Sequence, residues 1–402
     1  MMTKLVPKLR FKEFSGEWEE DILGKVVKFL DGKRKPIKES DRASMQGEYP
    51  YYGASGIIDY VNDYIFDEDL ILLGEDGENI VSRNLPLVFK VSGKSWVNNH
   101  AHVLKPLKEH KLDFLVQYLE NLSYAKYNSG GAQPKLNQAV CKTIPLIIPK
   151  PKEQQKIAST FLSLDNLIEA TKQKVEALQK HKKGLMQQLF PSDGEKVPKL
   201  RFKEFSGEWE EKKLGDIFTI FQGHAFSSHD SRDTGTRWVK IADVGIQKMD
   251  TKSASYLPIE YKNKYEKYLL KNGDYVIALT RPILNKKLKI APINKTYHNS
   301  LLNQRVGKII TSQNKTFVYY FLQTQELINS IERNIAGNEP PNLSMKQINK
   351  IKIYIPTPIE QQKIASTLSS LDNLIEATKQ KVEALQKHKK GLMQQMFVSG
   401  EG

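Results

Sequence analysis

Few residues in this chain have the spacing of a catalytic site or a metal centre. His100 and His102 could supply two nitrogen ligands, but no further Cys or His stands at ligand spacing from them. The run GKS at 93–95 resembles the end of a phosphate-binding loop, yet Val88 stands where that motif requires glycine. We therefore expect a binding protein with no catalytic residues, no metal and no cofactor of its own.

Positive charge is the clearest chemical signal, and it is unevenly distributed. The 402 residues include 61 Lys and Arg against 46 Asp and Glu, a net charge of +15. Residues 212–359 hold 23 basic and 11 acidic side chains, a net of +12, whereas 21–152 hold 18 against 16, a net of +2. Such an excess indicates a polyanionic partner, and nucleic acid is the first candidate.

Nucleic acid is read by exposed loop residues with amide, hydroxyl or basic side chains. Arg281 is the strongest single candidate, because it follows a predicted strand, adjoins a proline and precedes a basic run. In the first region the candidates are Lys33, Arg34, Lys35, Tyr52, Ser55, Asn98, Asn99 and His100. In the second region they are His224, Ser227, Arg237, Lys240, Arg281, Asn285, Lys286, Lys287 and Arg305. Tyr51, Tyr52 and Trp96 could stack on unpaired bases, although such aromatic residues more often belong to the core.

Two repeated blocks organise the chain that must position these loops. Residues 153–190 return at 360–397 with three differences, and residues 6–20 return unchanged at 197–211. The stretches between the blocks share almost no sequence. This pattern predicts a constant frame that sets geometry and two variable inserts that carry recognition.

Each long repeat has an apolar stripe in steps of four and three residues over about five heptads, which is typical of a coiled coil. A helix of this length spans about 57 Å at ~1.5 Å per residue, and alone it would leave the stripe in water. We expect the two copies to pack as an antiparallel pair, with dimerisation of two chains as the alternative. Thr171, Lys182 and their equivalents Thr378 and Lys389 interrupt the stripe and could set its register. The expected seam residues are Ile157, Leu164, Ile168, Val175, Leu178, Leu185, Ile364, Leu371, Ile375, Val382, Leu385 and Leu392.

The two inserts have the same kind of pattern, with short β-prone runs and helical stretches near 113–125 and 317–331. Both end on Pro-x-Leu, at 134–136 and 341–343, followed by a strand-like run that ends in proline. The inserts are therefore interpreted as divergent copies of one domain. The predicted class is α/β, with two small mixed α/β domains, two long helices in an antiparallel coiled coil and a pseudo-two-fold internal repeat.

These signals predict four parts. The first domain covers 1–152, the first long helix 153–190, the second domain 191–359, and the second long helix with a tail 360–402. The single cysteine, Cys141, permits no intrachain disulfide, which fits the reducing cytoplasm. The N-terminus lacks the apolar core of a signal peptide and no run is long enough to span a bilayer, so we expect no membrane association.

The doubled motifs resemble a known family. LRFKEFSGEWEE begins each half, Pro-x-Leu precedes the last strand of each insert, and EQQKIA and KHKKGLMQQ belong to each long repeat. In this order they are similar to the specificity subunit of type I restriction-modification enzymes, and the resemblance covers nearly the whole chain.

This resemblance implies that the inserts are target-recognition domains, each reading one half of a split, asymmetric site in double-stranded DNA. It implies that the helices fix the gap between the half-sites and that two modification (methyltransferase) subunits dock on the constant regions. S-adenosylmethionine would bind to those partners, and ATP and Mg²⁺ to restriction subunits. The alternatives from the residues themselves are a coiled-coil adaptor that binds only protein and a nuclease that acts alone.

Overall fold

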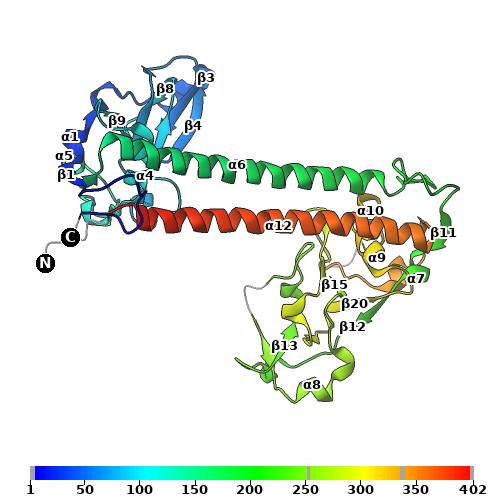
Figure 1. Ribbon diagram of the computed structural model, residues 1–402. Coiled ribbons are helices and arrows are strands. Elements are labelled where there is room, and N and C mark those ends of the chain that lie inside the picture. Colours follow the sequence, from blue (N-terminus) through cyan, green and yellow to red (C-terminus); the bar gives the residue numbers. More distant parts are fainter. Residues whose placement is uncertain (1–4, 251–253, 336–339, 399–402) are drawn as a thin grey trace. The chain divides into compact units, whose positions relative to one another are not determined.

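The computed structural model describes residues 5–250, 254–335 and 340–398, and it divides into two compact units (Figure 1). The first unit combines Met1–Gln173 with Lys379–Gly402, and the second is Lys174–Thr378. Helices α6 (Pro151–Gln188) and α12 (Pro358–Met396) each contribute to both units. The end of the predicted tail, 399–402, lies outside the described residues.

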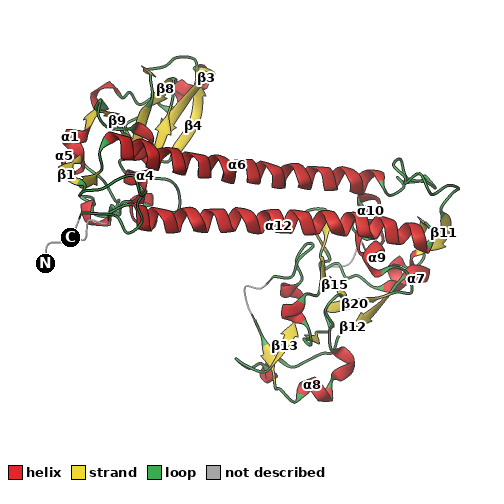
Figure 2. Cartoon of the chain, in the orientation of Figure 1, coloured by secondary structure: helices red, strands yellow, loops and turns green. Residues whose placement is uncertain are grey.

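The first unit contains two four-stranded sheets and a two-stranded ribbon. Figure 2 draws the strands in yellow. One sheet is antiparallel with the order β2-β9-β6-β7, and the other has the order β4-β3-β8-β5 with β3 and β8 parallel. The ribbon pairs β1 with β10. The strands are β1 (Glu19–Ile22), β2 (Val27–Phe29), β3 (Gln46–Gly53), β4 (Gly56–Val61), β5 (Phe66–Asp67), β6 (Leu70–Gly74), β7 (Val88–Val91), β8 (Lys94–Val97), β9 (Ala101–Pro106) and β10 (Pro145–Ile148).

The second unit repeats this plan. Its antiparallel sheet has the order β12-β20-β15-β18, its second sheet has the order β14-β13-β19 with β13 and β19 parallel, and its ribbon pairs β11 with β21. The matching strand orders confirm that the inserts are copies of one α/β domain. The strands are β11 (Glu210–Lys213), β12 (Thr219–Gln222), β13 (Thr236–Val239), β14 (Tyr256–Leu257), β15 (Tyr275–Ala278), β16 (Ile283–Leu284), β17 (Lys287–Leu288), β18 (Ile290–Pro292), β19 (Leu301–Leu302), β20 (Val306–Ile310) and β21 (Lys352–Ile355).

Short helices connect and cover these sheets. The prediction of a single helical stretch near 317–331 is wrong, because this segment forms two helices separated at 322–324. Asn314 caps the first of them, and the Thr324 hydroxyl donates to the Phe321 carbonyl at 2.9 Å where it ends. The helices are α1 (Leu23–Val26), α2 (Glu39–Ser44), α3 (Asn79–Ser82), α4 (Leu112–Asn121) and α5 (Gln138–Lys142) in the first unit, and α7 (Leu214–Ile217), α8 (Tyr261–Lys264), α9 (Lys315–Phe321), α10 (Gln325–Ile335) and α11 (Met345–Ile348) in the second.

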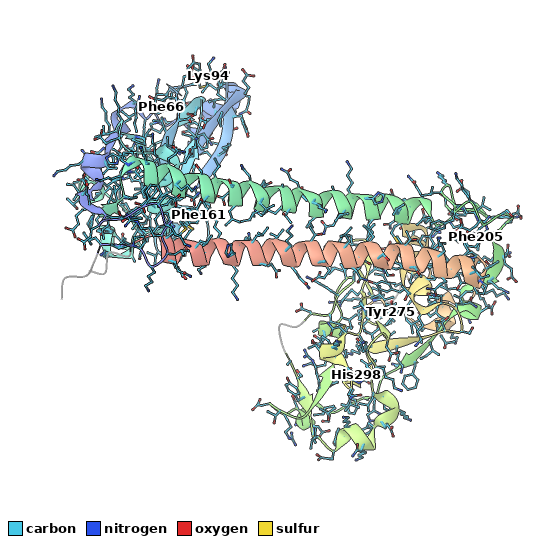
Figure 3. The ribbon with its side chains drawn as sticks, in the orientation of Figure 1. Phe66, Lys94, Phe161, Phe205, Tyr275 and His298 are labelled. Carbon is cyan, nitrogen blue, oxygen red and sulfur yellow. The ribbon has the colours of Figure 1, made fainter. Side chains whose placement is uncertain are left out.

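The long helices run antiparallel within each unit. In the first unit Phe161, near the start of α6, stacks on Phe397, just beyond α12, with 5.6 Å between ring centroids. Figure 3 labels Phe161 on α6. In the second unit Lys182, near the end of α6, forms an ion pair of 2.6 Å with Asp372 in the first half of α12. All twelve expected seam residues are buried or half-buried. Burial of this stripe supplies the hydrophobic stabilisation that an isolated helix would lack.

The short repeated blocks fasten the ends of the long helices. Arg10 forms a bidentate pair with the buried Glu153 at the start of α6, at 2.8 and 2.7 Å, and the Leu9 amide donates to the Gln395 carbonyl at the end of α12. In the second unit Arg201 and Glu360 repeat the pair at 2.8 Å, and Leu200 donates to Gln188. Each block therefore joins the start of one helix to the end of the other.

Candidate DNA interface

Three loops of the first unit converge where β3, β6 and β8 end. The Asn98 amide donates to the Tyr52 carbonyl at 3.0 Å, and the Glu75 amide donates to the His100 carbonyl at 2.9 Å. Gly74 permits the close approach, because a Cβ there would lie 2.7 Å from the Ala54 carbonyl oxygen. Most of the candidates in this unit belong to this loop cluster or to the 31–36 loop that contacts it.

The turn at 98–100 presents two of those candidates. The Asn98 side chain is buried, and its oxygen accepts from the His100 amide at 2.8 Å, so it closes an Asx turn. Asn99 and His100 are exposed on that turn. The His100 Nδ1 lies 2.8 Å from the Asp76 carboxylate, which orients the imidazole.

The Arg34 side chain links two loops of this cluster. Its guanidinium pairs with Glu75 at 2.6 Å and donates to the Ala101 carbonyl at 2.8 Å. Because these donors already have protein partners, the geometry gives Arg34 a role in holding the loops. Its predicted contact with DNA stays a prediction.

A buried histidine completes the same network. The two ring nitrogens of His102 lie 2.7 Å from the Asp31 carboxylate and 2.8 Å from the Leu136 carbonyl oxygen. Burial lowers the pKa of His102, but its interactions with Asp31 and Cys141 outweigh burial and raise the pKa to about 10. His102 therefore acts as a buried cation that ties the 31–36 loop to the Pro-x-Leu segment.

The other candidates of the first unit differ in exposure. Lys33, Lys35 and Ser55 are exposed, and Ser55 occupies the tip of the β3–β4 hairpin. Tyr52 is half-buried against Phe89, and burial raises the pKa of its phenol. Tyr51 and Trp96 are core residues, 1% and 5% exposed, which favours the structural role for these two aromatic residues over base stacking.

The second unit builds the same loop cluster. The Asn303 amide donates to the Val239 carbonyl at 3.1 Å, and the Leu279 amide donates to the Arg305 carbonyl at 3.0 Å. His224 joins through its amide, which donates to Leu302 at 2.9 Å. Gly223 is required beside it, because a Cβ would lie 2.2 Å from the Asn303 carbonyl oxygen.

A basic hairpin adjoins this cluster. Strands β16 and β17 are joined by Asn285 and Lys286, whose φ values of 50° and 56° fit a two-residue turn of the primed type. Asn285, Lys286 and Lys287 are exposed on the hairpin. Arg281, at the base of the hairpin, is also exposed, with a φ of 46°.

The proline carbonyl of each Pro-x-Leu motif accepts a hydrogen bond from a loop of the cluster in its own unit. The Arg281 amide donates to the Pro341 carbonyl at 2.8 Å, and in the first unit the Gly77 amide donates to Pro134 at 3.0 Å. The sequence showed the repeated motif but not its partner, because the pairing joins segments about 60 residues apart.

The remaining candidates of the second unit contact neighbouring side chains. Arg237 lies over the Tyr297 ring at 4.0 Å and Lys240 over Trp238 at 5.3 Å. The Ser227 hydroxyl accepts from the His229 amide at 3.2 Å. His224 is half-buried, with its ring 4.7 Å from Tyr265.

Two aspartates pair with the lysines that interrupt the seam. Asp165 accepts from Lys389 at 2.7 Å, and Asp372 accepts from Lys182 at 2.6 Å. Each aspartate also binds its own domain, since Gln117 of α4 donates to Asp165 at 3.1 Å and the Tyr320 hydroxyl of α9 donates to Asp372 at 2.7 Å. The heptad pattern identified the lysines but not these partners, because the aspartates stand outside the apolar stripe.

Within 5–250, 254–335 and 340–398, no three His, Cys, Asp or Glu side chains come together in a way that could hold a metal ion. None of the helices formed by these residues is long and apolar enough to cross a membrane.

The chain thus has two domains with the same scaffold, and each domain presents a cluster of exposed loops. This arrangement is that of a binding protein with two recognition domains. The model of the type I restriction modification DNA specificity domain matches residues 15–180 and 206–387, so the chain belongs to that family. Family membership makes DNA target recognition its function, and the protein-only adaptor is not favoured.

Individual relatives agree with this assignment. The chain is 30% identical over 407 residues to the type I restriction enzyme MjaVIII specificity subunit of Methanocaldococcus jannaschii, covering 95% of this chain and 94% of the relative. It is 28% identical over 360 residues to a putative type I restriction enzyme specificity subunit of Haemophilus influenzae, with 89% and 88% covered. The crystal structure of an S subunit from M. genitalium shares the fold, with a TM-score of 0.63, 17% identity, and 98% and 99% of the two chains covered.

Proposed function

We propose that each unit reads one half of a bipartite, asymmetric DNA target through its loop cluster. The observation that carries this proposal is the repetition of one loop scaffold with different exposed side chains, Asn99 and His100 in one unit and Gln304 and Arg305 in the other. Different side chains on the same scaffold read different base edges, so an asymmetric target follows.

The long helices provide the second part of the proposal. A helix of 38 residues is about 57 Å long, or ~17 base pairs of duplex, so α6 and α12 have a length suited to spacing two half-sites. Their outer faces and the repeated blocks form a constant surface for two modification subunits and for restriction subunits. This chain is then non-catalytic: S-adenosylmethionine binds to the modification subunits, and ATP and Mg²⁺ act at the restriction subunits. The names of the relatives, which are subunits of type I restriction enzymes, support this division of labour.

The test is gel-shift binding of the full chain, together with its modification subunit, to duplexes of different sequence across a salt series. DNA recognition predicts a strong preference for some sequences and a steep decline of affinity with salt. An adaptor predicts neither. Incubation of the purified chain with DNA and divalent metal supplies the control for catalysis, since cleavage would contradict the non-catalytic role.

A further inference from the structure

One turn has the same hydrogen bonds in both units although the surrounding sequences differ. Asn98 and Asn303 each donate a backbone amide to the end of a parallel neighbour strand, at 3.0 and 3.1 Å, and each accepts with its side-chain oxygen from the amide two residues later, at 2.8 and 3.2 Å. Both asparagines are buried, 4% and 9% exposed. The buried asparagine is therefore the constant part of the turn.

The carbonyl of the last turn residue is also fixed. His100 accepts from the Glu75 amide at 2.9 Å and Arg305 from the Leu279 amide at 3.0 Å. Glu75 and Leu279 follow β6 and β15, which occupy the same place in their sheets. Both ends of the turn are thus held by backbone hydrogen bonds, and the positions of its two exposed side chains are defined before any ligand binds.

Those two side chains are where the units differ. The first unit carries Asn99 and His100, and the second carries Gln304 and Arg305. All four are exposed, and within the described residues we find no side-chain hydrogen bond or ion pair of Asn99, Gln304 or Arg305. His100 alone has a carboxylate partner, Asp76.

We propose that this turn, 99–100 in the first unit and 304–305 in the second, is a base-reading site, and that its ligands are purine edges in the major groove. The amides of Asn99 and Gln304 have the donor and acceptor that match N7 and N6 of adenine, and the guanidinium of Arg305 matches O6 and N7 of guanine. This inference rests on the DNA recognition proposed above and names residues that perform it.

The structure also gives a reason to place base contacts here instead of phosphate contacts. A bidentate contact needs a side chain whose origin is fixed, since geometric error weakens both of its hydrogen bonds. The two backbone anchors of the turn provide that preorganisation and reduce the entropy lost on binding. A phosphate contact requires only a mobile positive charge, as Lys286 and Lys287 on the neighbouring hairpin can supply.

The experiment selects preferred sequences from a pool of randomised duplexes, with the full chain bound to its modification subunit. Arg305→Gln and Arg305→Lys are compared with Lys352→Ala, a control that removes one positive charge from an exposed pair on β21. We expect Arg305→Gln to lose discrimination for guanine by about 5- to 100-fold at one position of one half-site. Arg305→Lys should lose part of it at the same position, because an ammonium group lacks the planar fork of a guanidinium. The control keeps the full preference, and thermal unfolding verifies that each variant is folded.

The reciprocal experiment changes a residue of the first unit. Asn99→Ala should relax the preference for adenine at one position in the other half-site and leave the half-site affected by Arg305 unchanged. The inference is overturned if the Arg305 variants weaken all duplexes alike, as loss of a phosphate contact would, or if the variants of both units alter the same half-site. If the unmodified protein shows no sequence preference, the proposed function itself fails, and this outcome is distinct from the other two.

Discussion

The protonation of His102 follows from its geometry. Both of its ring nitrogens lie within 2.8 Å of oxygen atoms that can only accept hydrogen bonds here, the Asp31 carboxylate and the Leu136 carbonyl. A neutral imidazole has one N–H and would leave one of these contacts without a proton. The folded first unit therefore contains an imidazolium ion, in agreement with a pKa of about 10.

We predict that His102 makes the first unit less stable as pH rises from about 6.5 to about 10. The folded pKa lies above the ordinary value of 6.5, so the stabilisation is complete below pH 6.5 and is lost as the folded state releases its proton. His102→Gln should cost up to about 3 kcal/mol at pH 6, because the buried Asp31 carboxylate loses its nearest cation and keeps only Arg34, at 3.7 Å, and the cost should be smaller at pH 10.

Thermal unfolding of both proteins from pH 6 to 10 measures the difference. His388→Gln, at an exposed position on α12, is the matched control and should keep the wild-type pH profile. A constant difference between His102→Gln and wild type over this range would show that the histidine is neutral in the folded protein.

Sequence patterns could not separate candidate residues that are exposed from those whose side chains hold the loops together. Arg34 and Lys33 are neighbours of similar chemistry, yet only Arg34 is tied to Glu75. Asn98 and Asn99 are the same residue type, yet one is buried and closes a turn while the other is exposed. Such differences depend on contacts between loops that are distant in sequence, and a local pattern contains no information on them.

At the scale of elements, the long helices were the most predictable part. Their period is a local property repeated over five heptads, and the helices run from 151 to 188 and from 358 to 396, close to the expected spans. The break between α9 and α10 was missed because 322–324, Leu-Gln-Thr, contains no glycine or proline and so gives no clear signal for the end of a helix. Helix propensity alone does not reveal a break at which a side chain, here the Thr324 hydroxyl, bonds the last carbonyl of the first helix.

We predict that the Asp165–Lys389 pair fixes the register of the helices in the first unit. Asp165→Lys places two ammonium groups together and removes the acceptor of Gln117, so it should lower the free energy of unfolding by about 1–3 kcal/mol. Adding Lys389→Asp should recover much of this loss, because it restores a pair of opposite charges. Denaturant unfolding of the two single variants and the double variant gives the coupling energy.

Reversal of Lys196–Glu208, an exposed pair, is the control and should leave stability almost unchanged, because solvent screens the two charges. An additive result for Asp165 and Lys389, with no recovery in the double variant, would rule out a role for their pairing in the register.

At the scale of the whole molecule, one exposed basic segment of the second unit contrasts with paired basic residues of the first. In the first unit Arg42, Lys90 and Lys105 are paired with carboxylates. In the second unit Lys262, Lys264 and Lys267 are exposed on the 261–268 segment, and Lys264 and Lys267 lie over tyrosine rings. Residues 212–359 of the second unit, with a net charge of +12, are therefore expected to supply most of the attraction to DNA phosphates.

We predict that Lys262→Gln, Lys264→Gln and Lys267→Gln together reduce the salt dependence of DNA binding without changing the preferred sequence. Each lysine that contacts a phosphate contributes about 0.9 to the slope of log affinity against log salt, so the slope should fall by up to ~3. Substitution of Arg42, Lys90 and Lys105 by Gln is the matched comparison and should change the slope much less. Equal changes in the two variants would contradict this division of charge.

The division of the chain between the units has a consequence for its synthesis. The second unit is one continuous segment, 174–378, whereas the first needs Met396 and Phe397 to complete the core around Phe161. On the ribosome, the domain that is made second can therefore fold first, and the domain that begins the chain must wait for its last helix. During that interval Phe161 and its neighbours remain open to solvent, and the nascent chain passes through a stage in which it is most exposed to proteases and chaperones.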